Sequence, residues 1–469
     1  MSDLAYTPAV EQAELVKKGE VSPVELVTMY LQRIEEFDPQ LNSYVTVTGE
    51  QALAEAEAAE KALVSGAELP PFHGVPISIK DLFETEGVKS TFSCRALAEY
   101  VPDQDDNSVK RIKEAGFIML GKTNTSEFGS VPVAESILNG ICRNPWNTDH
   151  TSGGSSGGAA AGLAAGLAPI AQGSDGGGSI RIPSSCCGVF GIKPSRGRVS
   201  SGPRLGEHWH GFSTQGPIGR TVKDAAALLD VMEGYETGDP SGAPHPERPF
   251  ADEVGRDPGK LRIGFTTTNP NEIEIDPACK TAMESAAKLL ESLGHDVEEA
   301  APDWIEPSLA PTFVQLIQTG TAVLDFLPKD QLEPLNRFLI ESAHEVSSVQ
   351  HIQALTSAHA FGRRMMEFWE TFDILLTPTL SLPPIPVGWI FSDDDPMMQL
   401  IRSGMFIPFT PASNVTGQPA VSVPLHWSDA GLPIGVQLIG RAFDEATLIR
   451  LSAQLEEAEP WAGKRPPLG

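Results

Sequence analysis

The sequence predicts one α/β domain whose N-terminal part is a layer of helices. Apolar residues recur at helical spacing between residues 8 and 65, and from about residue 70 the pattern changes to the alternation of a strand. Residues 261–300 then follow the order strand, helix, strand, which is typical of an α/β sheet. The length of 469 residues and the hydrophobic fraction of 41% are sufficient for a large buried core.

Helices are expected throughout residues 8–65. Two apolar faces in this region repeat every three to four residues, and residues 50–64 are rich in alanine and glutamate. The two faces are made by Val10, Ala13 and Val16 and by Leu26, Met29, Tyr30 and Ile34. We therefore expect this region to pack as helices over the domain that follows.

Short strands are expected after the helical layer. Val75, Ile77 and Ile79 alternate with more polar positions, and FIML (117–120) and GVFGI (188–192) are short apolar runs of strand length. These segments predict the first strands of the central sheet.

The second half of the chain starts with residues 236–260, a run rich in proline, glycine and acidic residues that is expected to be a linker or an excursion. Beyond it we expect a strand at 261–265, a helix at 279–294 and a strand at 295–300. Residues 308–371 are expected to be mostly helical, followed by short buried strands within 374–386 and 419–425.

Composition excludes several classes of function. The formal net charge of -28 disfavours binding to a phosphate backbone, so no nucleic-acid partner is expected. Five cysteines without Cys-x-x-Cys or Cys/His spacing predict reduced thiols and no zinc site. The first residues do not resemble a signal peptide, and the longest weakly polar stretch, 158–171, is too short to cross a bilayer. We expect a cytoplasmic protein without a membrane partner.

Residues 116–123, GFIMLGKT, fit the pattern of a phosphate-binding P-loop. Such a loop needs small, flexible residues between a strand and a helix. Here the four intervening residues are Phe, Ile, Met and Leu, which are suited to a buried strand. A strand ending in a turn is therefore the preferred interpretation, and nucleotide binding is the alternative.

Residues 153–157, GGSSG, fit the nucleophile elbow of α/β-hydrolases, with Ser155 as the nucleophile. That interpretation needs a histidine further along the chain. His351, His359 and His426 are available, but no local feature marks any of them as catalytic. The Ser/His triad is kept as a second alternative.

A lysine offers another base for a serine nucleophile. Burial disfavours the ammonium form, so a buried lysine can accept a proton at neutral pH. Lys80 ends the apolar run HGVPISIK, and strand alternation places it on the same face as Ser78. A single lysine at a strand end would otherwise be a solvated charge.

Two glycine segments accompany Lys80: the first glycine segment, SGGSSGG (152–158), and the second glycine segment, GSDGGGS (173–179). The second places Ser179 after three glycines whose N–H groups can turn toward one point, as an oxyanion hole requires. Ser-Ile-Arg-Ile-Pro then suits the start of a helix. A tight loop between strands is the structural alternative.

Several motifs together resemble the amidase signature family over nearly the whole chain. Its blocks appear in the family's order, and the 24-residue spacing between Ser155 and Ser179 is the family's spacing. The matching blocks are GVPISIKD (74–81), GKTNTSEFG (121–129), NPWN (144–147), SGGSSGGAAA (152–161), GSDGGGSIRIPSSCCGVFGIKPS (173–195) and GLPIGVQLIGRAFDEATLIRLSAQLE (431–456).

The resemblance implies a Ser, cis-Ser, Lys triad that needs no metal and no cofactor. Ser179 is the implied nucleophile, Ser155 the bridging serine after a cis peptide bond, and Lys80 the base. The implied oxyanion hole is formed by the N–H groups of Gly176, Gly177, Gly178 and Ser179. An alanine-rich buried helix is expected to join the two glycine segments.

Four further positions follow from the resemblance. Asp175 and Arg181 are expected to support the loop, with a plain salt bridge as the alternative for Arg181. Gly129 and Ser130 are expected near the acyl-binding pocket. Gly176 departs from the family, which usually has Thr or Ile there, and predicts a more flexible oxyanion loop or room for a bulkier acyl group.

The fold implied by the resemblance is a single domain with a central mixed sheet covered by helices on both faces. The expected parts are the helical layer (1–65), the catalytic core (70–235), the excursion (236–260), a variable substrate-side region (261–410) and a return to the core (411–469). The aromatic residues of 308–405 are candidates for a pocket, although most are expected in the core.

The expected function is hydrolysis of small to medium carboxylic amides, with esters, carbamates and oligomeric amides as further substrates. The segment 196–230 resembles stand-alone members, including those acting on nylon-type amides. One alternative is the glutamine-amidase A subunit of a tRNA-dependent amidotransferase, although the Tyr-Gly associated with it is missing after Lys193-Pro194. A nucleotide-binding or non-catalytic protein is an alternative of another class. A homodimer is compatible with the resemblance.

Overall fold

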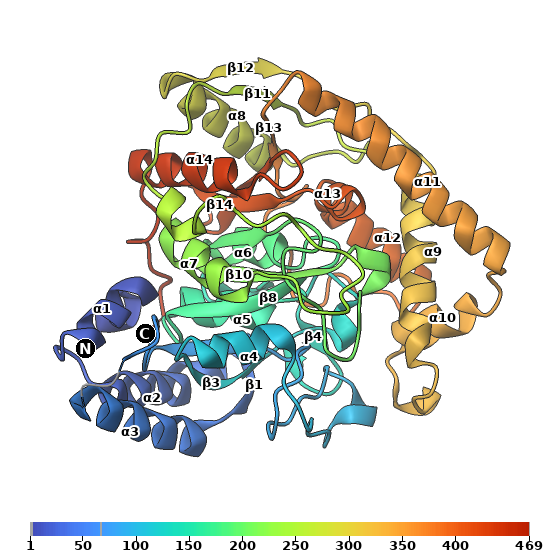
Figure 1. The fold of residues 1–469 in the computed structure, drawn as a ribbon. Coiled ribbons are helices and arrows are strands. Elements are labelled where there is room, and N and C mark those ends of the chain that lie inside the picture. The colour runs from blue at the N-terminus through green and yellow to red at the C-terminus, as the bar shows by residue number, and fades with distance from the viewer. Residues whose placement is uncertain (1–2, 66–67, 469) are drawn as a thin grey trace.

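In the computed structural model, which describes residues 3–65 and 68–468, the chain folds around one large sheet (Figure 1). In spatial order its strands are β1 (Tyr44–Val47), β3 (Ile118–Thr123), β2 (Pro76–Lys80), β8 (Ile170–Asp175), β10 (Thr214–Gly219), β9 (Phe190–Lys193), β14 (Ala420–Trp427), β15 (Pro433–Ile439), β13 (Ile374–Pro378), β11 (Arg262–Phe265) and β12 (Asp296–Glu299). Two small ladders lie outside it: β4 (Glu135–Ser136) with β5 (Gly140–Ile141), and β6 (Arg143–Asn144) with β7 (Asn147–Thr151).

The large sheet is mixed, as expected. β2 runs parallel to both β3 and β8, and β11 runs parallel to both β12 and β13. The remaining pairs are antiparallel. The predicted fold class, a single α/β domain with a mixed sheet between helices, is confirmed.

Helices cover both faces of this sheet. They are α1 (Ala9–Lys17), α2 (Pro23–Leu41), α3 (Gly49–Ser65), α4 (Asn107–Glu114), α5 (Gly157–Ala164), α6 (Arg181–Cys187), α7 (Val222–Met232), α8 (Pro277–Ser292), α9 (Leu309–Thr321), α10 (Pro334–Ala343), α11 (Ser348–Met366), α12 (Pro396–Phe406), α13 (Thr410–Thr416) and α14 (Glu445–Ala458). Neighbouring residues Ile170 and Ala171 of β8 belong to two different hydrophobic clusters. Helices α4, α7, α8 and α14 contribute to the first cluster, and α5 and α6 to the second.

The N-terminal helices form the expected layer, at the lower left of Figure 1 and close to the C-terminus. A capping box starts α2: the Ser22 hydroxyl accepts from the Glu25 N–H, and the Glu25 carboxylate accepts from the Ser22 N–H. Apolar residues of α2 and α3 then pack against Ile118 and Leu120 of β3.

The expectation of helix throughout residues 8–65 is wrong at β1. Asn42 ends α2 in the left-handed conformation, with φ of 55°. The chain then continues as Tyr44–Val47, which pairs antiparallel with β3. β-Branched Val45, Thr46 and Val47 favour this strand, and pairing with β3 supplies the hydrogen bonds that a four-residue strand needs.

Most other expected elements are present within one or two residues, including β2, β9, β11, α8, β12 and the helical stretch after residue 308, whereas β3 continues three residues beyond its expected end. Three central strands, β8, β10 and β15, were not predicted. Each contains glycine, and β10 and β15 also contain proline, so local strand propensity is low. Within 374–386 only Ile374–Pro378 forms a strand.

Residues 236–260 contain one short 3₁₀ helix, Phe250–Glu253. The Asp230 carboxylate at the end of α7 accepts hydrogen bonds from the N–H groups of Phe250 and Ala251, and Phe250 is buried. The segment is therefore anchored to the domain at this point.

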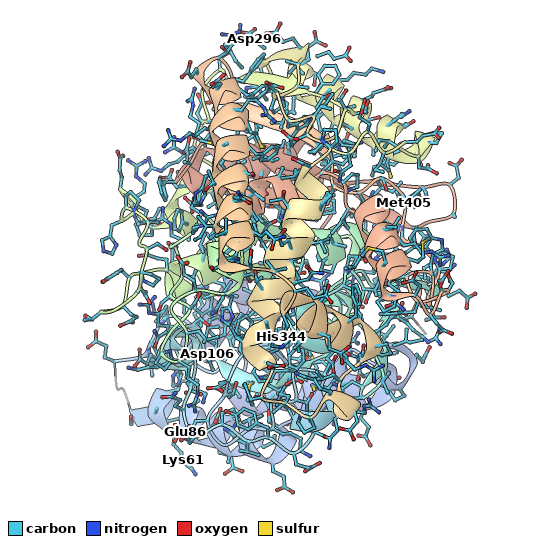
Figure 2. The ribbon with its side chains drawn as sticks, turned by 90° about the vertical axis from the view of Figure 1, so that its right-hand side faces the viewer. Lys61, Glu86, Asp106, Asp296, His344 and Met405 are labelled. Carbon is cyan, nitrogen blue, oxygen red and sulfur yellow. The ribbon has the colours of Figure 1, made fainter. Side chains whose placement is uncertain are left out.

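Helices α9 to α12 gather at one side of the molecule (Figure 1), and Figure 2 turns that side to the viewer. There Met405 marks the end of α12 and His344 follows α10, while Asp296 of β12 and Lys61 of α3 mark opposite ends of the molecule. No helix in the described part of the chain is long and apolar enough to cross a bilayer.

Candidate active site

Two neighbouring parallel strands bring the predicted base beside the second glycine segment. Lys80 is the last residue of β2, and the pairing of Ile79 with Gln172 of β8 places it level with the end of that strand. Residues at the carboxyl ends of parallel strands meet at one edge of a sheet, where ligand sites commonly lie. The topology therefore brings together segments nearly 100 residues apart.

Lys80 is completely buried and contacts two serine hydroxyls. Its Nζ lies 2.7 Å from Ser155 Oγ and 2.9 Å from Ser174 Oγ. Burial lowers the pKa of Lys80 well below its usual value, although the charge of Asp175 partly opposes this. The surroundings therefore favour the neutral amine, which has a lone pair to accept a proton.

Glycines of the first glycine segment lie so close to neighbouring backbone that a side chain would not fit. The Gly154–Ser155 peptide bond is cis, as the resemblance implied. A Cβ atom on Gly154 would lie 2.3 Å from the carbonyl carbon of Val133, and one on Gly158 would lie 2.3 Å from the carbonyl oxygen of Ser43. This close packing of backbone on backbone fixes the position of the Ser155 hydroxyl.

The two glycine segments contact each other directly. The Ser156 N–H donates to the carbonyl oxygen of Ser179 at 3.2 Å, and its hydroxyl donates to the carbonyl oxygen of Ser174 at 3.2 Å. The expected helix between the segments is α5, but the chain returns through strand β8 before reaching Ser179. The prediction of a helix alone was therefore incomplete.

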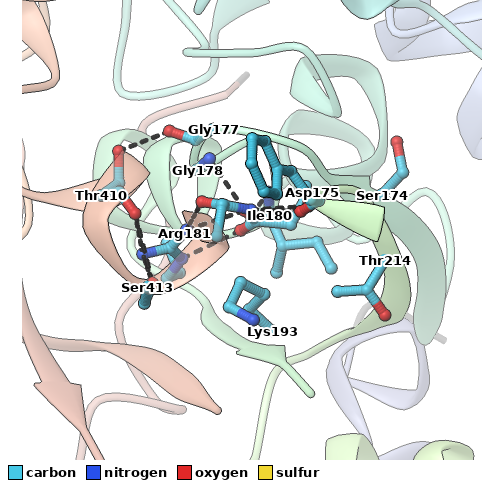
Figure 3. Close-up of polar contacts among 12 residues, drawn as sticks. Ser174, Asp175, Gly177, Gly178, Ile180, Arg181, Lys193, Thr214, Thr410 and Ser413 are labelled. Carbon is cyan, nitrogen blue, oxygen red and sulfur yellow. Dashed lines mark hydrogen bonds and ion pairs between the residues drawn. The ribbon is translucent and has the colours of Figure 1, made fainter. Parts of the chain in front are cut away.

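Asp175 and Arg181, which lie on either side of Ser179 in the sequence, form a bidentate ion pair (Figure 3). Arg181 Nε donates to Asp175 Oδ2 at 2.9 Å and Nη2 donates to Oδ1 at 2.7 Å, with both side chains fully buried. Burial alone would raise the pKa of Asp175, but the charge and hydrogen bonds of Arg181 outweigh it and lower this pKa to about 2. Asp175 is therefore an anion at any physiological pH.

The anion also holds the backbone of the loop that carries Ser179. Asp175 Oδ1 accepts from the Gly178 N–H at 2.8 Å, and Oδ2 accepts from the Ile180 N–H at 3.2 Å. On the other side of the loop, the Thr410 hydroxyl donates to the carbonyl oxygen of Gly177 at 2.6 Å. The backbone on both sides of Ser179 is thus held by the Asp175 carboxylate, and that of Gly177 by a hydroxyl from α13.

These bonds change the predicted set of oxyanion donors. The sequence indicated the N–H groups of Gly176, Gly177, Gly178 and Ser179, but that of Gly178 already donates to Asp175. A glycine is nevertheless required at 178, because its φ is +124° and a Cβ atom would lie 2.4 Å from Thr410 Oγ1. The N–H groups of Gly176, Gly177 and Ser179 remain as candidate donors.

The sequence did not indicate the supporting polar residues. Ser174 is the second hydroxyl on Lys80, and its position in the second glycine segment was the one available signal. Asn414 of α13 accepts from Arg181 at 2.7 Å and donates to Asp175 Oδ1 at 2.9 Å. Thr410 and Ser413 of the same helix also accept from Arg181. No local pattern links these positions to residues more than 200 positions earlier in the chain.

Two cavities meet at Ser179. The larger has a volume of about 290 Å³ and is lined by Ser155, Ser174 and Ser179 together with several residues of the segments 205–215 and 319–324. The smaller has a volume of about 130 Å³ and is lined mostly by apolar residues from α9, α12 and α13. Gly129, Ser179 and Trp209 line both cavities.

The remaining predicted site residues border these cavities. Gly129 has φ of +74°, and a Cβ atom there would lie 3.0 Å from Ser155 Oγ. Ser130 lines the smaller cavity, and its hydroxyl donates to Asn336 Oδ1 at 2.5 Å. Among the aromatic candidates, Phe313 lines the smaller cavity, whereas Phe361 lies in the core as most of them were expected to.

The space beside Gly176 is filled. A Cβ atom on Gly176 would lie 2.8 Å from Cε3 of Trp209. The expectation of room for a bulkier acyl group at this position is therefore wrong, because the indole of Trp209 occupies that room.

The P-loop interpretation of residues 116–123 is wrong. Gly121, Lys122 and Thr123 continue strand β3, and the buried Lys122 ammonium donates to the Phe83 carbonyl and the Thr85 hydroxyl. This segment offers no cradle of free N–H groups for a phosphate.

The Ser/His triad also lacks its geometry, because the Ser155 hydroxyl contacts Lys80. Within residues 3–65 and 68–468, no cluster of three His, Cys, Asp or Glu side chains is placed to hold a metal ion. All five cysteines are buried free thiols.

Comparisons with known proteins agree with this geometry. A sequence model of the Amidase family matches residues 25–449. The 6-aminohexanoate-cyclic-dimer hydrolase of Paenarthrobacter ureafaciens is 36% identical, with 99% of this chain and 97% of that protein covered. The A subunit of the glutamyl-tRNA(Gln) amidotransferase of Geobacter sp. is 34% identical, with 98% of each covered. A solved structure of a 6-aminohexanoate cyclic dimer hydrolase superimposes with a TM-score of 0.94 at 35% identity, covering 99% of both chains.

Proposed function

The chain belongs to the amidase family and is an enzyme that hydrolyses the C–N bond of amides, and we propose that it acts on small to medium uncharged amides through an acyl-enzyme on Ser179. One observation carries this proposal. The fully buried Lys80 has its Nζ 2.7 Å from Ser155 Oγ, and Ser155 and Ser179 line the same cavity. This is the arrangement that a serine nucleophile needs when its base is a lysine instead of a histidine.

The first step forms the tetrahedral intermediate. Ser179 Oγ attacks the amide carbonyl carbon and passes its proton to Ser155 Oγ, while the Ser155 proton moves to the neutral amine of Lys80. The carbonyl oxygen becomes an oxyanion that accepts hydrogen bonds from the N–H groups of Gly176, Gly177 and Ser179. Lys80 is then an ammonium, and the substrate carries the balancing negative charge.

The second step breaks the C–N bond. The Lys80 ammonium returns its proton through Ser155 to the leaving nitrogen, so an amine departs and an ester to Ser179 remains. Water then follows the same path: it gives a proton to Ser155 and attacks the ester carbonyl, and the proton returns to Ser179 Oγ as the carboxylic acid leaves.

Asp175 and Arg181 support these steps as positioning residues. The Asp175 carboxylate fixes the N–H groups of Gly178 and Ile180 on either side of the nucleophile, and Arg181 keeps that carboxylate charged. A preorganised donor loop costs no reorganisation when the oxyanion forms.

The cavities favour uncharged substrates. In the described part of the chain the lining of the smaller cavity includes no charged side chain, and the larger includes one acidic residue, Glu207, which is exposed. An uncompensated charge would be costly in such a site. The relative's cyclic dimer of 6-aminohexanoate supports oligomeric amides as one substrate class, with esters and carbamates as further acyl donors.

We further propose a cytoplasmic protein that forms a homodimer.

The amidotransferase A subunit is the second candidate, because one such protein is 34% identical. Its substrate would be glutamine, whose ammonium and carboxylate groups need charged partners. The neutral smaller cavity and the residues Ser195-Arg196 after Lys193-Pro194 disfavour this candidate. Turnover of free glutamine faster than of uncharged amides would reverse this preference.

The test is covalent labelling with a fluorophosphonate followed by peptide mapping and amide kinetics. We expect the adduct on Ser179, its loss in Ser179→Ala, and a decrease in kcat of about 10⁴-fold or more for that variant. Ser155→Ala and Lys80→Met should each lower kcat by about 10²- to 10⁴-fold.

Ser184→Ala is the matched control, because this buried serine lies five residues after Ser179 and its hydroxyl donates to the Ile180 carbonyl. It should keep the label. An adduct on Ser155 would establish the elbow interpretation instead, and the absence of both adduct and turnover would contradict the proposal.

A further inference from the structure

Trp209 stands between the two cavities that meet at Ser179. It lies in the 3₁₀ turn Trp209–Gly211 and lines both the larger and the smaller cavity. Its backbone is in the left-handed region, with φ of 48°, and so is that of His210, with φ of 57°. Two consecutive non-glycine residues in this region are uncommon, so surrounding contacts must hold the turn in place.

Two glycines make room for the indole. A Cβ atom on Gly176 would lie 2.8 Å from Cε3 of Trp209, and a Cβ atom on Gly320 would lie 2.9 Å from Cδ1. These glycines come from the second glycine segment and from α9, so the ring is packed between them. The neighbouring His210 Nε2 lies 3.2 Å from the carbonyl oxygen of Leu316, which ties the turn to α9.

The proton path decides which part of an amide enters which cavity. The leaving nitrogen receives its proton through Ser155, and Ser155 lines the larger cavity but not the smaller one. The amine part of the substrate must therefore lie on the side of the larger cavity. The acyl part, bonded to the same carbonyl carbon, is directed to the other side of Ser179.

The smaller cavity limits what that acyl part can be. Its walls include Phe313, Ile317 and Ile182, and its volume is about 130 Å³. An apolar cavity of roughly 150 Å³ holds one benzene molecule, so this one accommodates an apolar group of about six carbon atoms. The larger cavity, at about 290 Å³, takes a bulkier and more polar amine.

We propose that Trp209 is a specificity-determining residue that separates an apolar acyl subsite from a larger amine subsite and limits the acyl group to about six carbons. The substrate class is then amides of short, uncharged carboxylic acids with larger amines. This inference rests on the proposed function, because it uses the path of the proton through Ser155. It also explains Gly176, which leaves the space that the indole fills.

The test is a series of p-nitroanilides with straight acyl chains of two to ten carbons. In the wild type, kcat/KM should rise by about fourfold for each added methylene while the chain is buried in the smaller cavity, and then fall beyond about six carbons. In Trp209→Ala the fall should disappear, with at least a tenfold gain for the ten-carbon chain and little change for the acetyl compound.

Gly320→Ala provides a second readout, since the added Cβ atom would displace the indole. It should change the ratio of kcat/KM for long and short chains by about fivefold or more in the wild-type background, and by less than about twofold in the Trp209→Ala background. If Trp209→Ala no longer reacts with the fluorophosphonate, Trp209→Phe takes its place, with a smaller gain for long chains.

The inference would be overturned if Trp209→Ala kept the wild-type limit on acyl length. Failure of the proposed function looks different. In that case the wild type would neither form an adduct on Ser179 nor hydrolyse any anilide, and the inference would fall with it.

Discussion

Asp175 should stabilise the wild-type fold at neutral pH, and it should destabilise the fold at the same pH when the guanidinium of Arg181 is removed. Both side chains are fully buried, and Arg181 donates to both oxygens of the carboxylate. Arg181→Met keeps a long apolar side chain and removes the positive charge. The variant therefore isolates the ion pair from the packing around it.

The magnitude follows from the pKa of Asp175. In the wild type the pKa is about 2, compared with an ordinary value of 3.8, so the folded state favours the charged form. This difference contributes about 2 kcal/mol of stability above about pH 5, which is lost as the pH falls through 4 toward 2. The contribution arises because burial, which alone would raise the pKa, is outweighed by Arg181.

Without Arg181, burial should raise the pKa of Asp175 above its ordinary value. A buried and unpaired carboxylate then destabilises the fold at neutral pH, by about 3–5 kcal/mol. This penalty should shrink as the pH falls and the carboxylate becomes protonated. The difference between wild type and variant should therefore be largest near pH 7–8 and smallest near pH 4.

The assay is urea unfolding of both proteins between pH 4 and 8, with the rate of fluorophosphonate labelling measured in parallel. Arg198→Met is the matched control, because Arg198 forms a buried ion pair with Glu445 at 3.1 Å and lines neither the larger nor the smaller cavity. It should cost stability but leave the labelling of Ser179 unchanged, whereas Arg181→Met should slow labelling. A loss below about 1 kcal/mol in Arg181→Met, or one that grows toward acid pH, would refute this reasoning.

Two further outcomes are expected from the geometry of the site. The kcat/KM of the wild type should fall on the acid side of a pKa well below that of an ordinary lysine, because burial lowers the pKa of Lys80 and its protonated form cannot accept a proton. Lys80→Arg should remain inactive across that pH range, since arginine stays protonated, and recovery at high pH would contradict a role as base. Gly178→Ala should lower both stability and kcat, because its Cβ atom would lie 2.4 Å from Thr410 Oγ1, whereas Gly177→Ala, with its nearest neighbour at 3.6 Å, should keep its stability. Equal loss of unfolding free energy in the two variants would contradict the close contact with Thr410.

The sequence indicated where the site lies because its signals are local. A few neighbouring residues are enough to recognise a glycine-rich segment, a lysine at the end of an apolar strand and a serine before a helix. Lys80, Ser155 and Ser179 are found together at one edge of the sheet. Their roles remain predictions that the labelling experiment tests.

Other features depend on contacts between distant segments and were not predicted from local patterns. Strands β8, β10 and β15 contain glycine or proline and become strands through pairing on both sides. β1 forms a strand inside a helical region because β3 lies beside it.

The fold class, the family's motifs and the positions of the predicted base and of the two serines can be read from the sequence alone, because periodicity and glycine requirements act over short distances. Which N–H donors are free and which side chain fills the space at the site depend on the tertiary structure. Gly178 gives its N–H to Asp175, and the bond from Thr410 to Gly177 joins residues 233 positions apart. Trp209 enters the space beside Gly176 because a turn and helix α9 hold it there. Such contacts are set by the packing of the whole chain, which no short stretch of sequence specifies.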